Sequence, residues 1–137
     1  MAGETDLKTL LSTMQPVMHA AAYVFCSVSQ EAYQTLSFSP LGIFHEQEGV
    51  TLILPEEQAR QAELRYDSSW ACISLTVHSS LAAVGFLAAI TARLAQAGIS
   101  VNAVSAYYHD HLFVPWENRE RAMQILKELG GSSNATR

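Results

Sequence analysis

Basic residues are scarce in this sequence and form no cluster. Lys and Arg number 8 against 13 Asp and Glu in 137 residues, which gives a formal net charge of −5. Because nucleic-acid binding depends on a basic patch that neutralises phosphates, no nucleic-acid partner is expected. Hydrophobic residues still make up 49% of the chain, so a folded protein rather than a disordered segment is predicted.

Long apolar runs and a targeting segment are also missing. The longest apolar-rich stretch, 81–94, is shorter than a membrane span and contains Arg93. The first residues, MAGETDLKTLL, place Glu4 and Asp6 ahead of any apolar run, which is not typical of a signal peptide. We therefore expect a cytoplasmic chain that makes no contact with a membrane.

Cysteines are few, and the common catalytic motifs are absent. Cys26 and Cys72 lie far apart in apolar, β-like runs and form no C-x-x-C pattern, so buried free thiols are predicted. The sequence contains no G-x-S-x-G elbow, phosphate-binding loop or H-E-x-x-H motif. Neither an enzyme nor a bound cofactor is therefore expected.

What the sequence does contain is an alternation of strand and helix patterns. Turn residues such as Gly49 separate short apolar runs, and acids after Pro55 suit the first turn of a helix. The first half is predicted to hold a helix over 7–14, a strand over 23–28 that begins as early as Met18, a hairpin of 42–46 with 50–54, and a helix after Pro55.

The second half repeats this order with one more helix. Ser79 or Ser80 is the expected cap of that helix, and Gly98 is its expected end. The second half is predicted to hold a strand over 70–77, a helix over 81–97, strands over 101–108 and 111–114, and an amphipathic helix over 117–129 that ends at Gly130-Gly131.

Two short stretches, VTLILPEEQARQA and HLFVPWENRERA, share a strand, a proline, an acidic first turn and a helix. Only about a dozen residues separate Val28 from Leu41, too few for a helix with its loops. We therefore predict an α+β protein of two ferredoxin-like units, with antiparallel sheets and helices on one face. The expected division is an abbreviated unit over 1–65, a complete unit over 66–130 and a disordered tail over 131–137.

The sequence His109-Asp110-His111 has several interpretations. Two imidazoles on one face of a strand, about 6.5–7 Å apart, suit half of a zinc site. The remaining ligands would be His19, His45 or His78, and no spacing favours any of them. A bend at His109-Asp110, with both histidines exposed at the end of a sheet, is the simplest interpretation because Asp is a good turn former.

One long stretch carries a family resemblance. Gly85-Phe86 opens the pattern, and LAQAGISV follows over 94–101. VSAY over 104–107 occupies the place of a strand that ends in I-S-T, and Asp110 precedes the strand over 112–114. This combination resembles the ACT domain, in particular the tandem branch of the CASTOR-type amino-acid sensors and of short bacterial proteins. The resemblance covers residues 70–130 and is only topological over 17–65.

The resemblance implies a βαββαβ ACT fold and an amino-acid ligand held between two ACT units. The ligand's carboxylate would use backbone groups of the loop leading into the first helix of the unit, and Asp110 would receive its ammonium. His109 and His111 have no role in the pattern. The implied ligand contacts are Ser80, Ala83, Val84, Gly85, Phe86, Leu87, Val101, Ala106, Tyr107 and Asp110, and no metal ligand is implied.

The expected function is therefore amino-acid sensing by a regulatory protein that forms a homodimer. Because residues 80–84 contain no carboxylate, a small or apolar amino acid is expected rather than a basic one. Two alternatives remain open. One is a ligand-free ACT module that serves only assembly, and the other is a small metal protein or enzyme that uses His109, Asp110 and His111.

Overall fold

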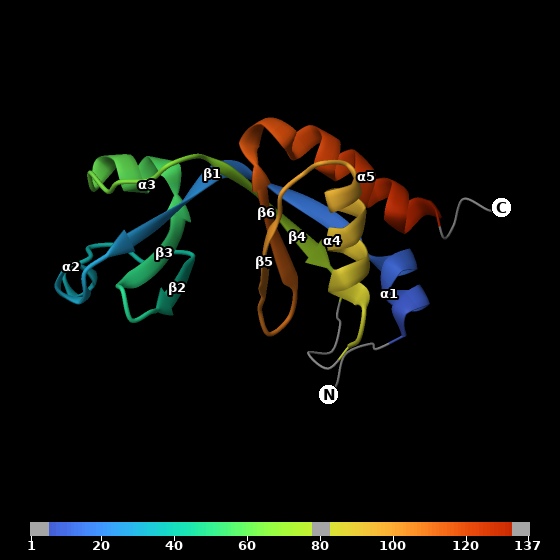
Figure 1. Cartoon of the computed structure of the whole chain (residues 1–137), viewed down its shortest axis with the longest axis horizontal. Coiled ribbons are helices and arrows are strands. Elements are labelled where there is room, and N and C mark those ends of the chain that lie inside the picture. Colours follow the sequence, from blue (N-terminus) through green and yellow to red (C-terminus); the bar gives the residue numbers. More distant parts are fainter. Residues whose placement is uncertain (1–5, 78–82, 133–137) are drawn as a thin grey trace. The chain divides into compact units, whose positions relative to one another are not determined.

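The computed structural model describes residues 6–77 and 83–132, and it confirms the predicted α+β class (Figure 1). The hydrogen-bonded strand order is β2-β3-β1-β4-β6-β5. Contacts divide the chain into unit 1, residues 1–19 with 71–137, and unit 2, residues 20–70. Among the described residues, no helix has the length and apolar character needed to cross a membrane.

Unit 2 is a three-stranded antiparallel sheet with two short helices. β1 (Gln15–Val28) is longer than the predicted strand, and its second part, Tyr23–Val28, pairs with β3 (Val50–Pro55). A five-residue helix, α2 (Gln30–Gln34), follows β1 and is capped by Ser29. The prediction of no helix between Val28 and Leu41 was therefore wrong, because a single capped turn fits where a long helix does not. The core of unit 2 consists of Val24, Cys26, Val50, Leu52, Leu54 and Ala59.

The predicted hairpin of unit 2 is confirmed. β2 (Gly42–His45) pairs antiparallel with β3, and the turn between them is closed by two hydrogen bonds. The N–H of Glu46 donates to the carbonyl of Gly49 at 2.9 Å, and the N–H of Gly49 donates back at 3.3 Å. Gly49 has a φ of 157°, so the turn uses a backbone conformation that side chains disfavour.

The helix predicted after Pro55 is α3 (Glu56–Gln61), with Pro55 at its N-cap. Tyr66 donates its hydroxyl to Glu56 Oε2 at 2.8 Å. This hydrogen bond lowers the pKa of the Glu56 carboxyl below its usual range. The bond therefore ties the loop after α3 to the first turn of the helix.

Substitution Tyr66→Phe is expected to lower the melting temperature modestly at neutral pH and to have less effect in acid. Because the folded-state pKa of Glu56 is lowered, its stabilisation is present above the unfolded-state pKa, about 4.3, and is lost as pH falls further. Thermal melts of both proteins from pH 7 to pH 3 test this. A difference in melting temperature that stays constant over that range would contradict it.

Unit 1 holds the larger core, which lies between helices and one face of its strands (Figure 1). Its elements are α1 (Leu7–Thr13), the first part of β1, β4 (Trp70–Thr76), α4 (Phe86–Gln96), β5 (Asn102–Ser105), β6 (Asp110–Pro115), the 3-10 turn η1 (Trp116–Asn118) and α5 (Arg119–Ser132). Side chains alternate along a strand, so Ala71, Ile73 and Leu75 of β4 face this core together.

The predicted helix over 81–97 begins later than expected. Ala83 and Val84 lie outside it, and α4 starts at Phe86 after Gly85, which adopts a left-handed φ of 87°. The apolar run was read as helix throughout, although a left-handed residue cannot continue a right-handed helix. The expected caps Ser79 and Ser80 lie outside the described residues. The predicted end is confirmed, because Gly98 follows the helix with a φ of 77°.

The C-terminal helix does not end at Gly130-Gly131 as predicted. α5 continues through both glycines to Ser132, and the remainder of the predicted tail lies outside the described residues. A Cβ on Gly130 would lie 3.1 Å from the carbonyl oxygen of Met14, just after α1. Gly130 therefore allows the close packing of α5 against α1 rather than a helix stop.

Candidate functional site

The segment leading into α4 carries the first group of predicted ligand contacts. Gly85 is the N-cap of α4, its carbonyl accepts the N–H of Ala89 at 2.9 Å, and no side chain among the described residues caps this end. The helix also has no acidic residue in its first turn. Since the first N–H groups of a helix have no partner within it, this end is suited to receive a carboxylate.

The other predicted contacts in this segment differ in exposure. Phe86 is 3% exposed and belongs to the core, so its side chain is not available to a ligand. Ala83 and Leu87 are partly buried against the same core, whereas Val84 is 83% exposed. Ser80 lies outside the described residues.

The second group of predicted ligand contacts lies on and around the strands β5 and β6. The N–H of Ala106 donates to the carbonyl of His109 at 3.0 Å, so the turn comprises residues 106–109. Tyr107 is 71% exposed and packs edge-on against Tyr108, with ring centroids 4.9 Å apart. Val101 is partly buried against the core.

Asp110 is not part of the turn. It is the first residue of β6, pairs with Ser105 across the hairpin and is only 9% exposed. The interpretation of His109-Asp110 as a bend between strands was therefore wrong by one residue, because the turn closes at His109. A nearly buried carboxylate at this point needs a stronger reason than turn formation.

A contact between the residue after β4 and the residue before β6 lies at one end of unit 1. His109 Nδ1 lies 3.3 Å from the carbonyl oxygen of Val77, the residue at which the chain leaves β4 toward α4. The β5–β6 turn and the start of α4 both lie at this end (Figure 1). The β5–β6 turn, which Asp110 follows, and the segment before α4 therefore lie at the same end of unit 1.

The histidines are not the exposed residues that the sequence suggested. His111 and His19 are half-buried, and both bind the hydroxyl of Ser74, at 2.7 Å from His111 Nδ1 and 2.8 Å from His19 Nε2. Burial lowers the pKa of the His111 imidazole, and the neighbouring His109 and His19 lower it further, whereas Asp110 opposes this shift. A lowered pKa favours the neutral ring.

Cys72 lies beside these histidines. Its thiol is buried, and this burial raises its pKa to about 11, which the hydrogen bond between Cys72 and Ser74 partly opposes. Sequence reasoning missed this group because His19, Cys72 and His111 come from distant segments. The one available signal was period-2 alternation, which places Cys72 and Ser74 on the same face of β4.

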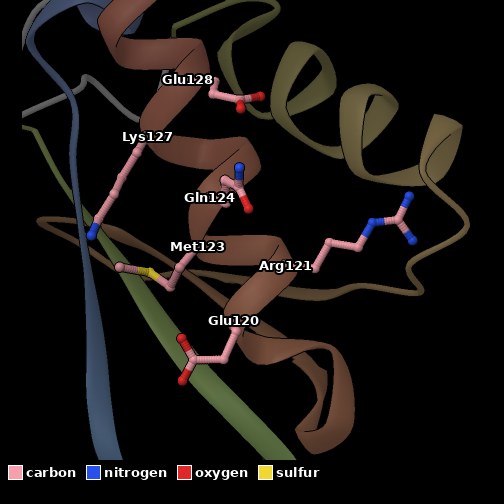
Figure 2. Close-up of a pocket in the computed structure, with 6 residues that line it drawn as sticks. All are labelled: Glu120, Arg121, Met123, Gln124, Lys127 and Glu128. Carbon is pink, nitrogen blue, oxygen red and sulfur yellow. The ribbon is translucent and has the colours of Figure 1, made fainter.

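A surface pocket on unit 1 does not coincide with either group. Its lining residues all come from α5, and Figure 2 shows their side chains pointing away on different sides of the helix. They combine two acids, two bases, an amide and a thioether with no common focus. The pocket is therefore the polar outer surface of an amphipathic helix. These residues are Glu120, Arg121, Met123, Gln124, Lys127 and Glu128.

Several known structures share this arrangement. A Vibrio cholerae protein of unknown function, described as a possible transport protein, is 44% identical with a TM-score of 0.82, over 90% of this chain and 95% of that one. A protein from Agrobacterium tumefaciens is 19% identical with a TM-score of 0.71, over 85% and 89%. The ligand-free regulatory subunit of aspartate kinase from Thermus thermophilus is 11% identical with a TM-score of 0.68, over 87% and 97%.

Family comparison agrees with the fold. Models described as ACT domain match residues 2–71 and residues 66–128, so both halves of the chain are matched. No curated protein matches the sequence. The two consecutive matches, together with the 44% identical structure, confirm the resemblance drawn from Gly85, Asp110 and their neighbours. The chain belongs to the ACT domain family, as a tandem ACT protein.

Proposed function

We propose that this chain is a regulatory protein that binds a small amino acid and responds by a change in self-association. The observation that carries this proposal is the Asp110 carboxylate, 9% exposed at the start of β6. A carboxylate is the natural partner of a ligand ammonium, and such charge-assisted hydrogen bonds are strong. Membership of the ACT family, whose fold is shared by an aspartate kinase regulatory subunit, supports a sensing role.

The other end of the ligand would meet the start of α4. A ligand carboxylate there would accept hydrogen bonds from backbone N–H groups that no side chain caps within residues 6–77 and 83–132. The positive end of the helix dipole would add to this attraction. Gly85 would leave this backbone uncovered, because it has no Cβ.

The neighbouring side chains favour a small or apolar ligand. Ala83, Val84 and Leu87 present only carbon atoms, and no carboxylate occurs in residues 83–87. Burying a Lys or Arg side chain beside them would leave a cation without a partner, at a cost of several kcal/mol. The high exposure of Val84 leaves it free to be covered when ligand binds.

Self-association would use the β5 side of unit 1. β5 is the last strand in the hydrogen-bonded order, and all four of its residues are exposed. Val104, Tyr107 and Tyr108 are among the exposed large hydrophobic residues and lie on this hairpin. An edge strand that adjoins a turn with exposed aromatic side chains is suited to pairing with a second copy. We therefore infer a homodimer that forms along β5.

A thermal-shift screen against the twenty amino acids tests the proposal. One or two small amino acids at about 100 times their dissociation constant should add about 2.7 kcal/mol, which raises the melting temperature by several degrees. Asp110→Asn should weaken that binding at least tenfold, because it removes a hydrogen bond between charged groups. Light scattering with and without the active amino acid would then measure the association state.

The matched control is Asp67→Asn, which removes an exposed acid from unit 2 and should bind the amino acid normally. No response to any amino acid would contradict sensing and favour the ligand-free assembly module. A response that survives Asp110→Asn would place the ligand elsewhere. Loss of a bound metal in Asp110→Ala would instead favour the alternative that uses His109, Asp110 and His111.

A further inference from the structure

Three strands of unit 1 bring potential metal ligands to one point. His19 from β1, Cys72 from β4 and His111 from β6 have their ligand atoms within 4.8 Å of one another. Since Ala71, Ile73 and Leu75 face the main core, alternation places Cys72 on the opposite face of β4. Within residues 6–77 and 83–132, it is the only group of three or more His, Cys, Asp or Glu side chains that converges in this way.

We propose that His19, Cys72 and His111 form a binding site for a zinc-like divalent metal ion. Two imidazole nitrogens and one thiolate are a ligand set that zinc prefers, at about 2.0–2.1 Å from nitrogen and about 2.3 Å from sulfur. In a tetrahedral site the three atoms would lie roughly 3.3–3.6 Å apart. Because the ligand atoms lie within 4.8 Å of one another, binding requires them to approach by at most about 1.2–1.5 Å, which rotation of half-buried imidazoles can supply.

Ser74 holds the two imidazoles in place when no ion is bound. Its hydroxyl has one proton, so with neutral rings one imidazole accepts that proton and the other donates an N–H to the Ser74 oxygen. A metal needs an unprotonated nitrogen from both rings. One imidazole must therefore move its proton to its other nitrogen. The Ser74 hydroxyl then either turns aside, which leaves the fourth coordination position to water, or occupies that position itself.

The two pKa shifts act in opposite directions on metal binding, because a neutral imidazole can coordinate whereas a protonated thiol cannot. The lowered pKa of His111 keeps its ring neutral and able to coordinate. The raised pKa of Cys72, about 11, keeps the free thiol protonated. Metal binding would form the metal–sulfur bond and release that thiol proton to solvent, so affinity should increase with pH. Two other titratable groups act on His111, namely His109 in the β5–β6 turn and Asp110 at the start of β6.

Cys26 is the matched control for Cys72. Both cysteines are free and buried, but Cys26 packs in the apolar core of unit 2 and belongs to no converging group of ligands in the described part of the chain. A thiol retained only for packing would behave like Cys26. A metal ligand would instead depend on His19 and His111.

The test is a titration of the whole reduced chain with Co²⁺, followed by competition with Zn²⁺. We expect one Co²⁺ per chain, a thiolate-to-cobalt charge-transfer band and displacement by Zn²⁺. Cys72→Ser and Cys72→Ala should abolish the band, while Cys26→Ser retains it. His19→Gln and His111→Gln should each weaken Zn²⁺ affinity at least tenfold, with circular dichroism confirming that every variant is folded.

Three results would overturn the inference. These are the absence of the band in the native chain, its survival in both Cys72 variants, and unchanged Zn²⁺ affinity in both histidine variants. The metal site and the amino-acid site can be distinguished by Asp110→Asn. This substitution should remove the response to amino acid but leave one Co²⁺ bound per chain.

Discussion

Truncation of Leu94 to alanine is expected to lower the free energy of unfolding by about 2–5 kcal/mol. Leu94 lies in the last part of α4, is fully buried and packs in the same core cluster as Phe86 and Ile90. The substitution removes apolar contacts and leaves a cavity that a closely packed core fills only partly. The backbone bonds to its carbonyl, from Ala97 and Ile99, would remain.

Urea unfolding measures this loss as a lower midpoint at an unchanged slope. Leu41→Ala is the matched control, because Leu41 is 54% exposed and its truncation leaves no cavity. That variant should lose no more than about 0.5 kcal/mol. Equal losses in the two variants would contradict the core assignment and place α4 elsewhere on the sheet.

Replacement of Gly49 by alanine is expected to cost about 2–4 kcal/mol, from backbone strain and overpacking together. An added Cβ would lie 2.9 Å from both Ser27 Oγ and the carbonyl oxygen of Val28. The serine hydroxyl can rotate away, but the carbonyl is fixed in the β1–β3 pairing next to Val50. The clash would therefore separate the paired ends of β1 and β3.

Gly98→Ala is the control that separates backbone strain from the steric clash of an added Cβ. Gly98 has a φ of 77°, but a Cβ there would meet nothing within 4 Å. Its replacement should cost only the left-handed backbone penalty, about 1–2 kcal/mol. Denaturant melts of both variants make the comparison, and a larger loss for Gly98→Ala than for Gly49→Ala would show that steric contact does not dominate at Gly49.

Local patterns predicted most elements of this fold. Short apolar runs bounded by turn residues located the strands, and Gly49 and Pro55 marked a hairpin and a helix start. The predictions were wrong where tertiary structure overrides local preference. Apolar residues before Gly85 resemble helix, but the left-handed glycine delays α4, and Gly130 resembles a stop although it packs against Met14.

The residues of one candidate site could be identified from the sequence, and those of the other could not. Asp110 was identifiable because the family pattern is contiguous around it, although its burial was not. The group of His19, Cys72 and His111 was not identifiable, because it depends on which strands are neighbours in the sheet. Strand order follows from the packing of the whole chain, and no residue spacing encodes it locally.

Unit 1 is built from two separate segments of the chain, which limits how the chain can be shortened. Leu10 and Met14 are 0% and 2% exposed within the core of unit 1, yet they precede unit 2 in the sequence. A gene fragment that began at residue 66 would encode β4 to α5 without these two side chains, so it would expose the apolar surface they cover. Deleting the first half therefore destabilises the second, so the two ACT units cannot be separated by a cut at residue 66.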